Sequence, residues 1–276
     1  MRHETFETPG DLTLEVRIPT GRIEIEAGDR TTTEVELDVR GGDEAAQILE
    51  EARIELRESR GGLEVVVEVE DRRWSRFWRR LDIRLRIQAP HGANVRVSTA
   101  SGDLRAQGRF GWLEAEAASG DIQVDELAGD ATAKAASGDV MLASVGGTAT
   151  VSTASGDVKL GHVAGQTLVK AASGDVTVGD AGGDATISTA SGDQRIEAVR
   201  AGKVELQSAS GDIRIGVRQG SNVWVDARAM SGDLSSEVTL GDEPPVEDAP
   251  LVELRAVSMS GDIDVVRAPA ASPSAH

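Results

Sequence analysis

Nine copies of the tripeptide Ser-Gly-Asp form the largest set of residues in this sequence that could do chemistry. If the copies stack in register, their aspartates form a ladder with neighbours about 4.8 Å apart. Adjacent carboxylates at that spacing repel by about 0.9 kcal/mol in water, so another interaction must offset the repulsion. The copies begin at Ser101, Ser119, Ser137, Ser155, Ser173, Ser191, Ser210, Ser231 and Ser260, and the first five steps are all 18 residues.

Two interpretations of the aspartate column are open. In the first, the glycine adopts a positive φ and the Asp or Ser oxygen caps backbone N–H groups of a turn. In the second, a divalent cation such as Ca²⁺ bridges neighbouring carboxylates. The general preference of Asp for turns favours the first, so we expect no metal and no cofactor. The residues of the alternative Ca²⁺ ladder are Asp103, Asp121, Asp139, Asp157, Asp175 and Asp193.

A second candidate is the segment 71–80, which holds five arginines and three aromatic residues. It lies between two predicted strands, which suggests a hairpin tip. Such a tip could dock on a protein partner or on another copy of this chain, or contact an anionic membrane. Alternatively, its aromatic residues fold back over the open end of the strand array. The candidate interaction residues are Arg72, Arg73, Trp74, Arg76, Phe77, Trp78, Arg79 and Arg80.

Signatures of enzymes and of nucleic-acid binding are missing. The sequence has no Gly-x-Ser-x-Gly elbow, no P-loop, no His-Glu-x-x-His motif and no cysteine. Trp112 and Trp224 have no aromatic companion on the repeats, so we expect them to cover the ends of the core rather than to bind sugars. The net charge of −18 argues against nucleic acid as a partner. We therefore predict a protein that is not an enzyme.

The elements that position these residues are β-strands. Within one repeat, residues 137–154, apolar and polar residues alternate with a period of two around two glycine-bearing turns. No proline occurs between Pro90 and Pro244, as expected where every N–H joins a ladder. A strand pair this short cannot bury its apolar face alone, but successive copies stacked as parallel strands can. The sequence predicts an all-β, single-chain β-solenoid with coils of about 18 residues and a narrow aliphatic core.

The chain divides into a cap, the solenoid and a tail. We expect an N-terminal β-rich cap over 1–96, the Ser-Gly-Asp solenoid over 97–268 and a disordered tail over 269–276. Within the cap, strands are predicted inside 11–39, 63–70 and 81–89, and a short helix inside 43–52. Thr20-Gly21-Arg22-Ile23 looks like a degenerate copy of the turn, so the cap itself includes an early coil. The charged start and the absence of a long apolar run predict a cytoplasmic location, or one peripheral to the inner membrane face.

The recurring segment VSTASGD, at 97–103 and 151–157, resembles the bacterial putative-adhesin family of β-strand repeat proteins, also called toastrack domains. The resemblance covers nearly the whole chain and implies a β-solenoid without known enzymatic activity, of a kind often found beside membrane anchors or envelope-stress modules. The expected function is a non-enzymatic, adhesin-like scaffold or interaction module linked to the cell envelope or stress response. The alternatives are an exported surface adhesin or ligand-binding protein and, as a minor one, a divalent-cation-binding solenoid.

Overall fold

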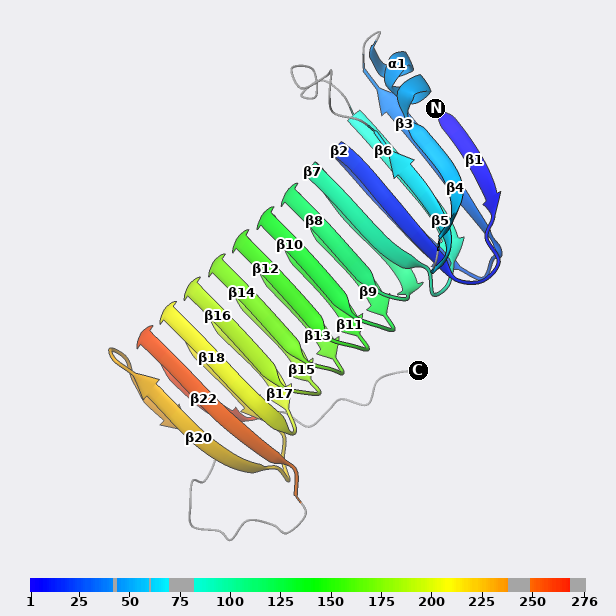
Figure 1. Ribbon diagram of the computed structural model, residues 1–276. Coiled ribbons are helices and arrows are strands. Elements are labelled where there is room, and N and C mark those ends of the chain that lie inside the picture. Colours follow the sequence, from blue (N-terminus) through cyan, green and yellow to red (C-terminus); the bar gives the residue numbers. More distant parts are fainter. Residues whose placement is uncertain (42–43, 60, 70–81, 238–248, 269–276) are drawn as a thin grey trace. The chain divides into compact units, whose positions relative to one another are not determined.

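The computed structural model describes residues 1–41, 44–59, 61–69, 82–237 and 249–268. The chain forms two compact units, Met1–Ala143 and Ser144–His276. Within each unit, β-strands from successive repeats lie side by side as parallel coils (Figure 1). The predicted all-β solenoid is therefore confirmed. No helix among the described residues is long and apolar enough to cross a membrane.

The first unit contains the cap and the first coils. Its elements are β1 (Arg2–Glu7), β2 (Leu12–Gly28), β3 (Thr32–Arg40), α1 (Glu44–Glu51), β4 (Arg53–Ser59), β5 (Gly62–Glu68), β6 (Asp82–Pro90), β7 (Asn94–Phe110), β8 (Leu113–Ser119), β9 (Ile122–Leu127), β10 (Ala131–Ser137) and the start of β11 (Val140–Val145). The helix predicted inside 43–52 is present as α1. Two strands, β1 and β4, were not predicted.

The second unit consists of later coils of the same design. Its elements are β12 (Ala149–Ser155), β13 (Val158–Val163), β14 (Thr167–Ser173), β15 (Val176–Ala181), β16 (Ala185–Ser191), β17 (Gln194–Val199), β18 (Gly202–Ser210), β19 (Ile213–Val217), β20 (Asn222–Ala229), β21 (Leu234–Ser236), β22 (Leu251–Ser260) and β23 (Ile263–Arg267).

Each coil consists of two strands joined by the Ser-Gly-Asp turn, and equivalent residues of successive coils stand in register. Val169 of β14 pairs with Ile187 of β16, for example, and Val178 of β15 pairs with Ile196 of β17. These side chains are almost completely buried. The inward positions thus form columns of aliphatic side chains, and the predicted aliphatic core is confirmed.

Glycine is required in the turn for two reasons. At Gly174 the backbone has φ = +124°, a conformation that L-residues with a side chain rarely adopt. A Cβ at this position would also lie 2.2 Å from the carbonyl oxygen of Gly156 in the preceding coil. Because the coils stack this closely at their turns, the glycine column follows from both backbone conformation and packing.

The cap contains an early coil, as the degenerate turn predicted. Thr20, Gly21 and Arg22 of β2 stand in register with the Ser101-Gly102-Asp103 turn of β7. On its other side, β2 pairs in parallel with β5 and β6. Antiparallel strands β3 and β1 extend the sheet beyond β6, and β4 extends it beyond β5. The first coil is therefore covered by further strands.

The last two coils do not stack in chain order. β22 pairs with β18 on one side and with β20 on the other. Similarly, β23 lies between β19 and β21. The coil 251–267 is thus inserted ahead of the coil 222–236, which becomes the outermost coil of the second unit (Figure 1). The expectation that successive copies stack in order is wrong here, because equivalent turns and apolar columns let the later coil pair with β18 and β19.

Candidate interaction site

The turn aspartates form ladders in which each carboxylate accepts a backbone hydrogen bond from the next coil. In the second unit, the N–H of Asp212 donates to Oδ1 of Asp193 at 2.8 Å. The same bond links Asp121 to Asp103, Asp139 to Asp121, Asp175 to Asp157, Asp193 to Asp175, Asp262 to Asp212 and Asp233 to Asp262. Each bond places a partial positive charge beside a carboxylate, which offsets the repulsion along the ladder. This geometry is the turn-capping arrangement.

The Ca²⁺ interpretation requires several carboxylate oxygens to face one ion. Among the described residues, no group of three or more His, Asp or Glu side chains is arranged to hold a metal ion. In each of these pairs, one carboxylate oxygen is already engaged by an N–H. Calcium binding by the ladder stays a prediction for measurement in solution.

The candidate interaction residues of segment 71–80 lie outside the described residues. The proposed binding tip of Arg72, Arg73, Trp74, Arg76, Phe77, Trp78, Arg79 and Arg80 therefore has no structural account. Its role stays a prediction.

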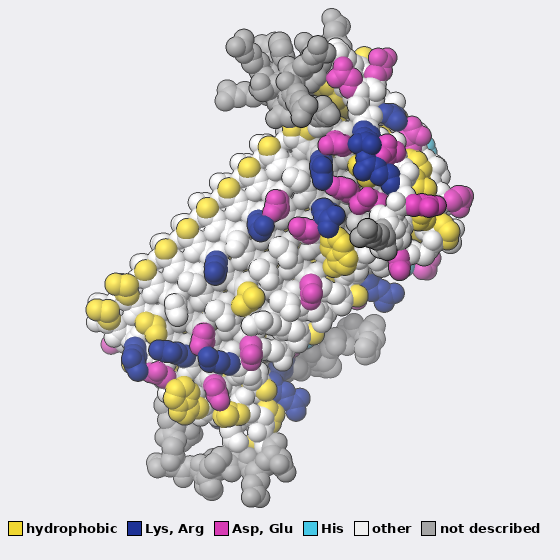
Figure 2. Space-filling view, in the orientation of Figure 1, with side chains coloured by type: hydrophobic (Ala, Val, Ile, Leu, Met, Phe, Trp, Pro, Cys, Tyr) yellow, Lys and Arg dark blue, Asp and Glu magenta, His cyan; other side chains and the backbone are white. Residues whose placement is uncertain are grey.

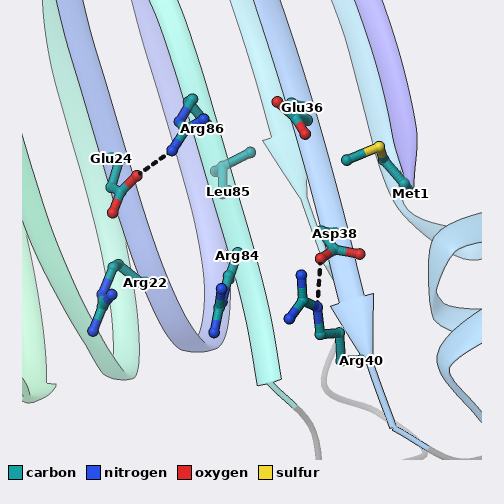
Figure 3. Close-up of a pocket in the computed structure, with 9 residues that line it drawn as sticks. All are labelled: Met1, Arg22, Glu24, Glu36, Asp38, Arg40, Arg84, Leu85 and Arg86. Carbon is teal, nitrogen blue, oxygen red and sulfur yellow. Dashed lines mark hydrogen bonds and ion pairs between the residues drawn. The ribbon is translucent and has the colours of Figure 1, made fainter.

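One charged hollow lies on the first unit, lined by side chains from β2, β3 and β6 (Figure 3). Its volume is about 190 Å³. Arg86 pairs with Glu24 at 3.2 Å, and Arg40 pairs with Asp38 at 2.9 Å. Both pairs are solvent-exposed, and exposed pairs of this kind contribute little energy. The lining holds four arginines and three acidic side chains, and Arg84 pairs with Asp82 outside it. Because most of these charges are paired, the small charge excess gives the hollow little power to select a ligand.

The open end of the second unit is the stronger candidate. β20 is its outermost strand on one sheet and, within the described residues, pairs only with β22. Five of the eight exposed large hydrophobic side chains in the described chain lie on the two outermost coils. They are Trp224 (56% exposed), Met230 (80%), Leu234 (54%), Leu251 (48%) and Met259 (56%). Figure 2 shows hydrophobic side chains beside acidic and basic ones over β20 and β22.

The described strands leave the core of the last coil uncovered on one side. Val252, Leu254 and Ala256 of β22 are completely buried, but their partners in β20, such as Val225, are only partly buried. Leu234 stands in register with Ile263, which is 1% exposed, yet Leu234 itself is more than half exposed. The apolar columns therefore end at a surface that solvent reaches.

Among the described residues, no strand pairs with the second edge of β20. The N–H groups of Asn222 and Met230 donate to carbonyl oxygens of the β22 segment. Since successive residues of a strand point their N–H and C=O groups to opposite sides, even-numbered residues face β22. Val223, Val225, Ala227 and Ala229 consequently direct their backbone groups toward the open side. This edge can accept another strand.

The charges near this edge are paired locally. Arg228 forms an ion pair with Asp226 at 3.1 Å on the same strand. On β18, a hydrogen bond from Lys203 lowers the pKa of the Glu205 carboxyl below its ordinary value, and Glu205 in turn raises the pKa of Lys203. Asp226 and Arg228 thus give the edge strand no net charge and place one charge of each sign close together.

Trp224 does not lie where the sequence predicted. It was expected to cover the end of the core, but it stands opposite Glu253 on the outer face of β20. The prediction was wrong because Trp224 lies between Val223 and Val225, which take the inward positions. The two-residue alternation of this segment was the signal that could have shown it. Trp112 also differs from expectation, because it lies partly exposed under the guanidinium of Arg96, 5.3 Å from the ring centre.

The chain matches the family model described as Toastrack DUF4097 over residues 8–266. Similar solved structures include a putative adhesin from Bacteroides fragilis (9% identity, TM-score 0.40, 96% of each chain covered). Others are a putative lipid binding protein from Parabacteroides distasonis (12%, 0.32, 96% of each chain) and a putative cell adhesion protein from Clostridium sporogenes (8%, 0.27, 96% of this chain and 99% of that chain). No curated protein matches the chain. Because the family match spans nearly the whole sequence, the chain belongs to the Toastrack family.

Proposed function

We propose that this chain is a non-enzymatic interaction module that binds an extended protein segment along the open edge of β20. The observation that carries the proposal is the end of the second unit. There, within the part of the chain that the structure describes, an unpaired strand edge, an uncovered core and five exposed hydrophobic side chains coincide. Native proteins usually protect such edges with charged residues, proline or a covering element. An edge with exposed Trp224 and Met230 favours a binding role.

An added strand would contact both the backbone edge and the exposed apolar side chains of this surface. The backbone N–H and C=O groups that face the open side would pair with the backbone of the incoming segment; they belong to Val223, Val225, Ala227 and Ala229. These hydrogen bonds supply affinity with little dependence on sequence. Exposed apolar side chains supply the rest, since burying one large side chain contributes up to about 1.5–3 kcal/mol. The incoming segment also covers the open end of the core, so both driving forces act at one place.

We further propose that binding takes place in the cytoplasm or at the inner face of the membrane, in keeping with the location predicted from the sequence. A link to the cell envelope or to a stress response belongs to the same proposal. Fractionation of native cells, combined with protease treatment from outside, tests the location. Protease cleavage of the chain in intact cells would refute this location and favour the exported alternative.

Site-specific photo-crosslinking in native cells tests the interaction. A photoreactive residue at position 222, on the edge strand, should crosslink to protein. The same residue at position 195, on the inner strand β17, serves as the control and should give far less product. Ala227→Pro removes an N–H that faces the open side, while the bonds to β22 remain, so this variant should abolish the crosslink. Ala227→Val keeps the N–H and should preserve the crosslink. Equal crosslinking at positions 222 and 195, or no crosslink at either, would refute the proposal.

A further inference from the structure

We infer that the segment docked on β20 is the β20 strand of a second copy of this chain, paired antiparallel about a two-fold axis. The inference rests on the proposed function and names the partner at the same site. It is supported by the pattern of β20, in which Trp224, Asp226 and Arg228 alternate along the outer face. The exposed Met230 directly follows the strand, and its N–H still bonds to the carbonyl oxygen of Ser258. In an antiparallel pair this pattern is complementary to itself.

The backbone limits the possible registers. Only odd-numbered residues direct their N–H and C=O groups to the open side, so odd residues must face odd residues of the second copy. One such register places the two-fold axis at Ala227, which then pairs with Ala227 of the second copy. Val225 pairs with Ala229 in the same register, and the backbone bonds of the edge are satisfied along the strand.

The charges select this register over its neighbours. With the axis at Ala227, Asp226 faces Arg228 of the second copy, and the symmetric contact forms on the other side. With the axis at residue 226, Asp226 would face Asp226 of the second copy. With the axis at residue 228, Arg228 would face Arg228 of the second copy. Like charges directly opposite one another destabilise a strand pair, and opposite charges stabilise it by similar amounts.

The apolar side chains fit the same register. Trp224 faces Met230 of the second copy, and this pair forms twice because of the symmetry. A methionine sulfur beside an aromatic ring is a favourable contact. Leu251 and Met259 lie on β22, one strand behind this contact, and extend the exposed hydrophobic surface beside it. A two-fold contact pairs the β20 edge of one copy with the β20 edge of the other. The assembly therefore closes as a dimer and does not grow into fibres through this edge.

A charge exchange tests the inference. Sedimentation velocity of the full purified chain, from micromolar to submillimolar concentration, should show a monomer–dimer equilibrium. Asp226→Arg and Arg228→Asp, each alone, create two like-charge contacts and should weaken the dimer by about tenfold or more. The double variant restores opposite charges in exchanged positions and should restore the dimer to near wild-type strength.

The control uses an equivalent ion pair away from the edge. Arg195 and Glu197 on β17 form a pair with the same spacing, at 2.7 Å. Glu197→Arg changes the net charge as Asp226→Arg does, but should leave the dimer unchanged. The inference would be overturned if the chain stayed monomeric, or if Asp226→Arg and Arg228→Asp left the strength of the dimer unchanged. If the crosslink at position 222 then captures a different protein, the proposed function survives without the dimer.

Discussion

Replacing Gly174 by alanine tests why the coils stack as they do. The substitution adds a single methyl group to the second unit. At this residue φ is +124°, and the new Cβ would lie 2.2 Å from the carbonyl oxygen and 2.7 Å from the carbonyl carbon of Gly156. Ordinary contacts of this kind are longer than about 3.4 Å. The two turns must therefore separate by more than about 1 Å, or the turn must change its conformation.

The cost follows from the bonds that hold the two turns together. Separation strains the bond from the Gly156 N–H to Ser173 O (3.1 Å) and the bond from the Val158 N–H to Asp175 O (2.8 Å). It also strains the bond from the Asp175 N–H to Asp157 Oδ1 (3.0 Å). Each lost bond costs about 1 kcal/mol, and the positive φ costs about 1–2 kcal/mol for a residue with a Cβ. We expect a loss of about 4 kcal/mol in the free energy of unfolding.

Thermal and urea unfolding, followed by circular dichroism, measure the effect. For a chain of this size about 4 kcal/mol corresponds to a fall in Tm of roughly 8–16 °C. The matched control is Gly220→Ala, because Gly220 has φ = +82° but no atom within 4 Å of the added Cβ. It carries the conformational strain without the clash and should lose only about 1–2 kcal/mol. Equal losses at both sites would show that close stacking does not set the glycine column.

Four further measurements bear on the same architecture. Asp193→Ala removes the acceptor of the Asp212 N–H and should cost about 1 kcal/mol, whereas Asp193→Asn keeps an acceptor oxygen and should cost less; equal losses would refute the capping role. Millimolar Ca²⁺ or a chelator should leave Tm unchanged, and a Ca²⁺-dependent rise abolished by Asp193→Asn would assign a cation to the ladder. Lys203→Met should raise the pKa of Glu205 toward its ordinary value in an NMR titration. Because the folded pKa of Glu205 is lowered, its pairing stabilises the fold above the unfolded pKa and is lost as pH falls through the folded value; the variant should lose this dependence in acid. Thr153→Val removes a buried hydroxyl that lacks a hydrogen-bond partner among the described residues and should stabilise the fold by about 1 kcal/mol; a loss of stability would show that the hydroxyl is satisfied.

The coils could be predicted because each repeat contains, within about 18 residues, the pattern that specifies its own strands and turn. The two-residue alternation fixes which side chains point inward, and the Ser-Gly-Asp spacing fixes where the chain turns. Even the imperfect copy at Thr20-Gly21 was recognisable, since the glycine is the residue that the turn requires. The helix α1 could be predicted from its own short pattern.

Other features depend on contacts that no local pattern contains. β1 has few apolar residues and is half-buried, so its sequence resembles that of a solvent-exposed segment. The insertion of coil 251–267 ahead of coil 222–236 could not be predicted, because both coils carry the same turn and equivalent apolar columns. The interaction site depends on this insertion, since the insertion determines which strand is left at the edge.

The two ends of the strand arrays differ in a way that favours binding at β20. In the first unit, β5 and β6 cover the edges of the first coil, and the core residues Leu14 and Ile25 of β2 are completely buried. Among the described residues, no strand gives the coil of β20 and β21 equivalent cover. If the chain stayed monomeric, a charged residue in place of Trp224 or a proline in the strand would protect this edge at little cost. Apolar residues beside one acid and one base suit a surface that is covered by a matching strand, and β20 itself has the matching pattern.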